Sequence, residues 1–235
     1  MSKISEKSIF YKLYLYYNLY VRHKALKKRN TYSQNQEDLF INNYFKAKNN
    51  GFYIDIGCYH PIKYSNTALL YNRGWRGINI DMNQTSIDLF NIFRKRDKNI
   101  CAAISNKNKK AVMYFDHLFS PINTLDKNFS NIASKKISFN HHTEKKIYTQ
   151  KFNEVIQKHN INIKQIDFIN IDVEAHDLEV LEGIDLSIFN AKMICIEIAN
   201  NQNNIKDKKL SDYLNKYNYD LIKTVGLNGF FELRD

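Results

Sequence analysis

Short apolar segments alternate with amphipathic ones along this chain from about residue 31 onward. The clearest apolar segments are GFYIDIG (51–57), RGINIDMN (76–83) and IDFINID (166–172), and each carries an acidic residue at or near its end. Segments of this length suit buried strands, and buried strands separated by helices are typical of a parallel sheet with crossover connections. The alternation therefore predicts an α/β fold.

The other segments complete a predicted sheet of seven strands, most of them parallel, with helices on its faces. Four more strands are expected at residues 99–105, 191–200, 219–224 and 229–233. Helices are expected after residue 33 and at residues 65–73, 85–94, 152–159, 177–182 and 208–217. Ser33 with Gln36 matches a helix-capping box, and Ser65 and Gly74 are placed to start and stop the second helix.

Residues 106–150 are less regular than the rest. AVMYF (111–115) is predicted to be a strand, whereas SPINTLDKNFS (120–130) and KKISFNHHTEKK (135–146) are predicted to be exposed loops. Loops on a rigid sheet commonly carry recognition. We therefore expect this segment to determine which molecule the protein acts on, with residues 120–130 as a lid.

The formal net charge of +11 comes mostly from one end of the chain. Residues 1–30 contain eight Lys or Arg residues and one acidic residue, so residues 31–235 are only mildly basic. The same segment is rich in tyrosine and predicted to be helical, but its apolar run is too short and too interrupted to span a bilayer. We expect residues 1–30 to be an extension of a domain formed by residues 31–235.

Three interpretations of this extension are open. It docks on its own domain or on a second subunit of a homodimer, it lies on an anionic membrane surface, or it contacts nucleic acid. The three cysteines lack the spacing of a disulfide framework or a cysteine zinc site, which favours a cytoplasmic location. Lipid binding by residues 1–30 is expected to place the protein at the inner face of the membrane.

Polar residues at the strand ends suggest a nucleoside-binding site. Ligands of open α/β sheets lie beyond the carboxyl ends of the strands, and a carboxylate such as Asp81 can accept hydrogen bonds from both ribose hydroxyls there. Gly57 allows a tight turn, but no second glycine follows before Gly74, so the dinucleotide fingerprint is missing. The pattern favours a nucleoside without a pyrophosphate, such as S-adenosylmethionine.

Several stretches resemble the FkbM-type methyltransferases: SQNQEDL (33–39), residues 51–83, CAAIS (101–105) and IDFINIDVEAHDLEVLEGID (166–185). Members of that family are S-adenosylmethionine-dependent enzymes with a Rossmann-like class I fold, and many methylate hydroxyl groups of sugars or polyketides. The resemblance covers residues 31 to 200 in order. Two departures are Ala175, where the family often has glycine, and Pro61, near which many class I enzymes have a second glycine.

The resemblance implies a cofactor site composed of Asp55, Gly57, Cys58, His60, Ser65, Asn66, Asp81, Met82, Ile104, Ser105 and Asp172. The first four belong to the loop after the first strand, near the methionine end of the cofactor. Ser65 and Asn66 are expected at a helix start, where backbone N–H groups can bind the cofactor carboxylate. Asp81 is expected to bind ribose.

The remaining cofactor residues are assigned by the same resemblance. Met82 is expected to pack on adenine, and Ile104 with Ser105 to border the base. Asp172 is expected to close the site near the reactive methyl group.

Three residues spaced two apart, Asp172, Glu174 and His176, are candidates for the chemistry. A sugar hydroxyl is a poor nucleophile at neutral pH, so a positioned base is useful. Crowded carboxylates raise one another's pKa, and histidine titrates near neutrality. We expect Glu174 or His176 to take the proton, with His60 as a second candidate; in the alternative, His176 only begins a helix and Glu174 only caps it.

Asp172, Glu174 and Glu197 also supply oxygen ligands of the kind that Mg²⁺ binds, but their spacing does not favour a metal site. The sequence thus predicts an O-methyltransferase acting on a sugar, glycan or related metabolite, with surface polysaccharide biosynthesis as its setting. An RNA methyltransferase is less favoured because the charge is terminal. A catalytically inactive cofactor-binding scaffold is the other alternative.

Overall fold

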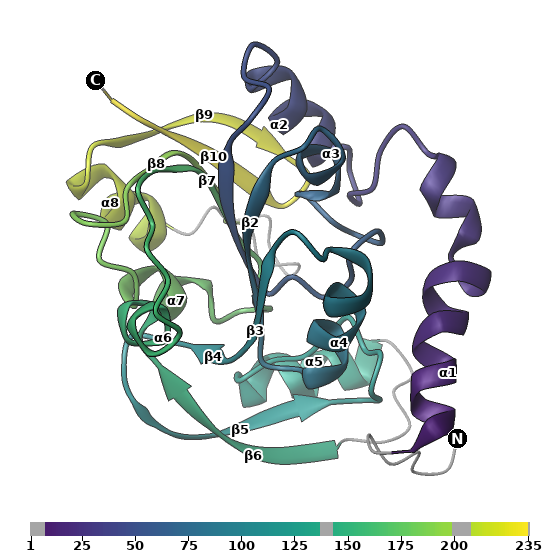
Figure 1. Cartoon of the computed structure of the whole chain (residues 1–235). Coiled ribbons are helices and arrows are strands. Elements are labelled where there is room, and N and C mark those ends of the chain that lie inside the picture. The colour runs from purple at the N-terminus through teal and green to yellow at the C-terminus, as the bar shows by residue number, and fades with distance from the viewer. Residues whose placement is uncertain (1–7, 137–142, 199–207, 235) are drawn as a thin grey trace.

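The computed structural model describes residues 8–136, 143–198 and 208–234 of the chain (Figure 1). Its centre is a seven-stranded sheet with the order β3-β2-β1-β7-β8-β10-β9. The strands are, in that order, Lys98–Cys101, Arg76–Asp81, Phe52–Ile56, Ile166–Ile171, Ala191–Glu197, Asn228–Leu233 and Tyr219–Val225. The first five are parallel, and β10 runs antiparallel to both β8 and β9. This confirms the prediction of a mostly parallel, Rossmann-like sheet.

Helices cover both faces of the sheet, as buried parallel strands require. They are α2 (Glu37–Tyr44), α3 (Ala68–Asn72), α4 (Gln84–Phe93), α6 (Phe152–Lys158), α7 (Asp177–Glu182) and α8 (Lys208–Lys216). Successive side chains of β1 point to opposite faces of the sheet. Ile54 packs in the cluster that contains Phe152 of α6, whereas Tyr53 packs with Leu70 of α3 and Trp75.

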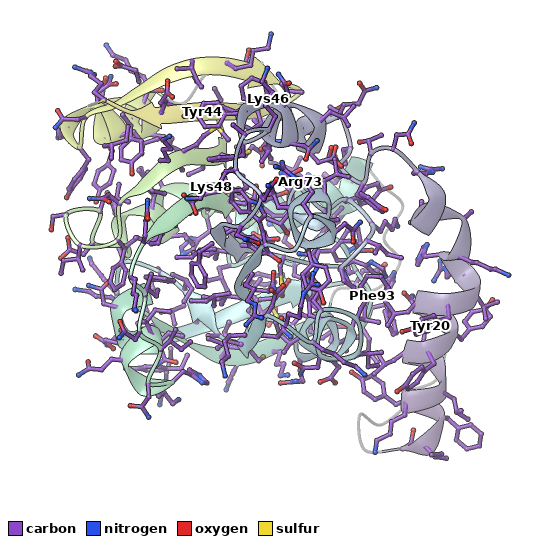
Figure 2. The ribbon with its side chains drawn as sticks, turned by 45° about the horizontal axis from the view of Figure 1, so that its top comes forward. Tyr20, Tyr44, Lys46, Lys48, Arg73 and Phe93 are labelled. Atoms are coloured by element: carbon purple, nitrogen blue, oxygen red, sulfur yellow. The ribbon has the colours of Figure 1, made fainter. Side chains whose placement is uncertain are left out.

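Arg73, just after α3, holds the end of α2 (Figure 2). Its guanidinium group donates to the backbone carbonyls of Phe45 at 2.9 Å and of Lys48 at 2.7 Å. Helix ends leave carbonyl groups without partners inside the helix, and an arginine side chain can satisfy several of them at once. This contact fixes the chain where it enters β1.

Two predicted helix starts are wrong by a few residues. α2 begins at Glu37 after Gln36, which adopts a left-handed conformation with φ 69°. Ser33 still contributes, because its hydroxyl oxygen accepts the N–H of Asp38 at 3.2 Å. α3 begins at Ala68, so Ser65 does not cap it; Ser65 instead accepts a hydrogen bond from a buried arginine described below.

The segment predicted to be mostly loops contains a second sheet, with the order β4-β6-β5. Its strands are Ala103–Ile104, Thr143–Gln150 and Lys109–Phe115, and α5 (Lys127–Lys136) connects two of them. The strand predicted over residues 99–105 is divided at Ala102 between the two sheets. The loop predictions for the described parts of 120–130 and 135–146 were therefore wrong in part, because β6 is lysine-rich and pairs with β5 alone over most of its length, which gives it a loop-like composition. Residues 137–142 lie outside the described part.

The N-terminal extension runs along one side of the domain (Figure 1). It consists of α1 (Ile9–Tyr17), a π-helical turn η1 (Asn18–Arg22) and a 3₁₀ turn η2 (Lys24–Lys28). Tyr11, Leu15 and Leu19 are buried against Leu89 of α4, and Figure 2 shows Tyr20 near Phe93 at the same junction. One face of the extension thus docks on its own domain. None of the helices in the described ranges has both the length and the apolar character needed to cross a membrane.

Candidate active site

A cavity opens at the carboxyl ends of β1, β2 and β7, the edge at which sheets of this kind bind ligands. The cavity and the open space at its mouth together amount to about 500 Å³. It is lined by Ile56, Gly57, Tyr59, Ile80, Asp81, Met82, Ala102, Ala103, Ile104, Pro121, Asn123, Leu125, Asp172, Val173, Glu174 and His176. Seven of these were predicted from the sequence: Gly57, Asp81, Met82, Ile104, Asp172, Glu174 and His176.

Gly57 joins the ends of two strands at the floor of the cavity. Its φ is +82°, and a Cβ atom at this position would lie 1.7 Å from the carbonyl oxygen of Asp172. Its N–H donates to the carbonyl of Ile80 at 2.8 Å. The glycine is therefore needed for the close approach of β1 and β7, in addition to the tight turn that the sequence predicts.

Asp81 is held in a fixed orientation by backbone N–H groups. Its two carboxylate oxygens accept from Tyr59 at 2.9 Å and from Asn83 at 2.7 Å. Burial raises the pKa of Asp81 to about 6, and these two hydrogen bonds oppose the rise. Each oxygen has a second lone pair, so the carboxylate can also accept hydrogen bonds from a pair of hydroxyl groups in the cavity.

Asn123 provides a buried acceptor without a partner. Its amide nitrogen donates to the carbonyl of Ser120 at 3.1 Å, but its buried Oδ1 has no hydrogen-bond partner. Leaving such a group unsatisfied costs about 1–3 kcal/mol, so each case calls for an explanation. Because Asn123 lines the cavity, a ligand with an N–H donor, such as an exocyclic amine, would satisfy it.

Acidic groups give the cavity a strong preference for positive charge. Burial, together with the charge of Asp55, raises the pKa of Asp172 to about 6. Burial and the charge of Asp172 raise the pKa of Glu174 to about 8, and the same two causes raise that of Glu197 to about 8. Glu197 lies behind the lining. A bound cation would favour the ionised form of all these groups.

The loop that carries Glu174 has an unusual backbone. Glu174 and Ala175 both have positive φ values, 56° and 71°. The Thr124 hydroxyl donates to the carbonyl of Glu174 at 2.7 Å, so a residue of the 106–150 segment holds this loop in place. Left-handed non-glycine residues store strain and cluster at functional sites.

His176 has contacts with both ring nitrogens. Nε2 lies 3.0 Å from Oγ of Ser105, and Nδ1 lies 3.6 Å from a carboxylate oxygen of Glu179. Burial is the main cause that lowers the pKa of His176, which keeps the ring neutral at pH 7. His176 precedes α7 as its N-cap residue, but its side chain does not cap the helix. Ser105 lies behind His176 and does not line the cavity.

Asp55 does not line the cavity but lies in the buried network beneath it. Its carboxylate oxygens accept from Thr67 at 2.6 Å and from Asn170 at 2.9 Å. Arg94, fully buried, completes this network by donating to Thr67 at 2.7 Å and to Ser65 at 2.7 Å. Arg94 was predicted only as the last residue of a helix, and its place in this network was not anticipated.

Asn66 and Cys58 also lie outside the cavity lining. The side-chain amide of Asn66 donates to Asn170 at 2.9 Å, and the N–H of Ser65 donates to the carbonyl of Tyr32. Cys58 packs with Ile87 and other apolar side chains of α4. These positions serve the packing around the site, so the expectation that Ser65 and Asn66 begin a helix facing the cofactor is wrong.

His60 joins the N-terminal extension to the domain. Its Nδ1 accepts the N–H groups of Ile62 and Lys63 at 3.2 and 3.1 Å. The proton is therefore on Nε2, which donates to Asn18 Oδ1 at 2.9 Å. Burial lowers the pKa of His60 well below its ordinary value. His60 does not reach the cavity, which corrects its assignment as a cofactor-binding residue and second candidate base.

Two further observations complete the site. Tyr59, Pro121, Asn123 and Leu125 line it without having been singled out, although the last three fall in the segment 120–130 that was predicted to be a lid. Within the described part of the chain, no group of three or more His, Cys, Asp or Glu side chains is arranged to hold a metal ion.

Comparison with known families gives one match. A model of the methyltransferase FkbM domain matches residues 55–221, more than half of the chain. The matched range contains every residue that lines the cavity. The comparison with curated proteins gives no match.

Proposed function

The chain belongs to the FkbM methyltransferase family, and from this premise we propose that it transfers a methyl group from S-adenosylmethionine to a hydroxyl group of a sugar, glycan or related metabolite. The observation that carries the proposal is the presence, in the lining of one cavity, of a carboxylate held by two backbone N–H groups, an asparagine whose amide oxygen has no partner, and two acidic groups with raised pKa values. These belong to Asp81, Asn123, and Asp172 with Glu174.

The lining residues fit the chemical groups of this cofactor. Asp81 offers acceptors for two hydroxyl groups, and Asn123 offers one for the amino group of adenine. Met82 and Ile104 provide an apolar surface for a flat base. The bound cofactor supplies a sulfonium-linked methyl group, which is already a strong electrophile.

Positive charge on the bound cofactor is matched by Asp172 and Glu174. Both carboxyl groups have raised pKa values, and a neighbouring cation favours their ionised forms. This electrostatic preference also opposes an RNA acceptor, because phosphates would be repelled at the cavity mouth.

We assign the role of general base to Glu174. No hydrogen bond occupies its carboxylate within the described residues, and its pKa of about 8 matches the working range. In the transfer, the oxygen–methyl bond forms as the sulfur–methyl bond breaks, and the hydroxyl proton passes to Glu174. His176, with Ser105 behind it, orients the acceptor from the adjacent position.

Calorimetry and activity measurements test the proposal. Wild-type protein should bind S-adenosylmethionine and its demethylated product, and it should add one CH₂ unit to members of a panel of monosaccharides and nucleotide sugars, detected by mass spectrometry. Glu174→Gln should lower turnover by about 10²- to 10⁴-fold while cofactor affinity changes little. Glu182→Gln, at an exposed position further along α7, is the matched control and should retain full turnover.

Three results would contradict these assignments. Wild-type protein that binds neither ligand would overturn the proposed activity. Methyl groups found on RNA but on no sugar would overturn the acceptor class. Full turnover by Glu174→Gln would mean that another group accepts the proton, and His176 would be the next residue to replace.

A further inference from the structure

The helix α1 and the turn η1 that continues it have two apolar faces, and the domain covers only one of them. Tyr11, Leu15 and Leu19 are buried against the domain. The other face consists of Ile9, Phe10, Leu13, Tyr16, Tyr17 and Val21, whose exposed fractions range from 48% to 70%. A surface helix ordinarily presents polar residues to water, and a contiguous exposed apolar surface marks a binding site.

Specific contacts prevent the helix from turning to bury this second face. The hydroxyl of Tyr11 donates to Asp88 of α4 at 2.7 Å. Seven residues further on, Asn18 accepts from the ring of His60 at 2.9 Å and is itself buried. Tyr14 adds an edge-to-face contact with Phe119, with ring centroids 4.9 Å apart. The exposed face is therefore held outward by the docking of the opposite face.

The charge of the same segment is entirely positive. Residues 9–30 contain six Lys or Arg residues and no Asp or Glu. Lys12, Arg22 and Lys24 are exposed alongside or just after the apolar face. Burial lowers the pKa of Lys63, and the charge of Arg22 is the second cause, which indicates positive potential where the extension meets the domain.

We infer that the exposed face of residues 9–24 is a docking surface for an anionic lipid membrane. Apolar and tyrosine side chains suit the interfacial region of a bilayer, and each Lys or Arg near an anionic surface adds to the attraction. A second copy of the chain fits less well, because a symmetric contact would place this uniformly positive segment against itself. The surface is independent of the proposed methyl transfer.

Vesicle co-sedimentation of the full chain tests this surface. Wild-type protein should sediment with vesicles of phosphatidylcholine and phosphatidylglycerol, and far less with phosphatidylcholine alone. The triple variant Phe10→Ser, Leu13→Ser, Val21→Ser should weaken binding by about tenfold or more. The control is Ile188→Ser with Ile222→Ser, which removes exposed apolar residues elsewhere and should bind as wild type.

A second pair of variants isolates the charge. Lys12→Gln, Arg22→Gln, Lys24→Gln should weaken binding by about 100-fold, from roughly 1 kcal/mol for each charge. Lys192→Gln, Lys216→Gln, Lys223→Gln changes the net charge equally at exposed positions in the C-terminal part and should have little effect.

The outcomes separate the alternatives. All variants change exposed residues, so unchanged melting temperatures and circular dichroism spectra would establish that they fold. The inference is overturned if wild-type protein does not bind anionic vesicles, or if it binds phosphatidylcholine vesicles equally well. It is also overturned if the apolar triple variant or the triple variant at Lys12, Arg22 and Lys24 binds as wild type. A contact between two copies of the chain would be shown instead if the wild-type protein is a dimer that does not bind vesicles and the apolar triple variant is a monomer. Because no cofactor or acceptor is present, failure of the methyltransferase proposal leaves this test intact.

Discussion

The two walls of the cavity are built in different ways. One wall is formed by the strand ends, with Gly57, Asp81 and Asp172, and continues directly into the parallel sheet. The other is formed by residues 121–125, which attach through an isolated bridge between Tyr114 and Thr124 and through a few side-chain bonds. The comparison teaches that the strand-end wall belongs to the core of the domain, whereas the wall that carries Asn123 is added to it.

The strand-end wall is supported from beneath by Arg94. The guanidinium group donates to the carbonyl of Pro61 at 2.8 Å, and to Ser65 and Thr67, both at 2.7 Å. Burial lowers the pKa of Arg94, but Tyr53, Asp97 and Asp55 together outweigh this effect and raise it. The loop that follows β1 is therefore connected to the interior by the guanidinium group of Arg94, and nearly all N–H donors of this group are hydrogen-bonded.

The largest effect is expected where this support is removed. Arg94→Met should lower the free energy of unfolding by about 3–5 kcal/mol, because it leaves Asp55 buried without its cation. Urea unfolding followed by circular dichroism measures the loss. The matched control is Arg96→Met, which removes an exposed arginine two residues away and should cost less than about 1 kcal/mol. Equal losses would mean that the wall does not depend on this network.

The next effect concerns cofactor binding and pH. The pKa of Glu174 is about 8 and that of Asp172 about 6 in the free protein. A bound cation lowers both, so binding of S-adenosylmethionine should release protons and tighten as pH rises from 6 to 8, by at most about tenfold per pH unit for each proton. Calorimetry in buffers with different ionisation enthalpies measures the proton release.

Two comparisons sharpen this linkage. The demethylated product lacks the sulfonium charge and should show a shallower pH dependence, and Glu174→Gln should flatten the dependence for S-adenosylmethionine. The free protein should show the opposite trend in stability. Because folding raises the pKa of Glu174 from 4.5 to about 8, its contribution is complete below pH 4.5 and is lost as pH rises through 8. If the affinities for S-adenosylmethionine and its demethylated product depend equally on pH, these carboxyl groups do not act on the charge of the sulfonium.

The difference between the walls also explains what the sequence could predict. Asp81 and Asp172 were placed correctly because buried strands have a local signature and parallel strands end at one edge. His60 and Ser65 were misplaced because their side chains are engaged by Asn18 and Arg94, which are distant in sequence and carry no local signal. The second sheet also depends on partners distant in sequence, because β6 pairs with β5, and its lysine-rich sequence has no local signal of this pairing.

The smallest effect is expected at the junction of the two walls. Thr124→Val keeps the size of the side chain but removes the hydroxyl that holds the carbonyl of Glu174. The free energy of unfolding should fall by only about 1 kcal/mol. Turnover should fall by about five- to tenfold, because the left-handed loop loses the contact that fixes the base, and a misplaced base loses efficiency.

Thr149 provides the control that separates stability from catalysis at this junction. It is also buried, and its hydroxyl donates to the carbonyl of Lys107 at 2.7 Å, but within the second sheet and away from Glu174. Thr149→Val should cost similar stability and leave turnover unchanged, whereas cofactor affinity should be unaffected in both variants. If both variants lose turnover equally, the second sheet acts on the site as a whole. If only Thr124→Val does, a single hydrogen bond transmits the position of the added wall to the catalytic loop.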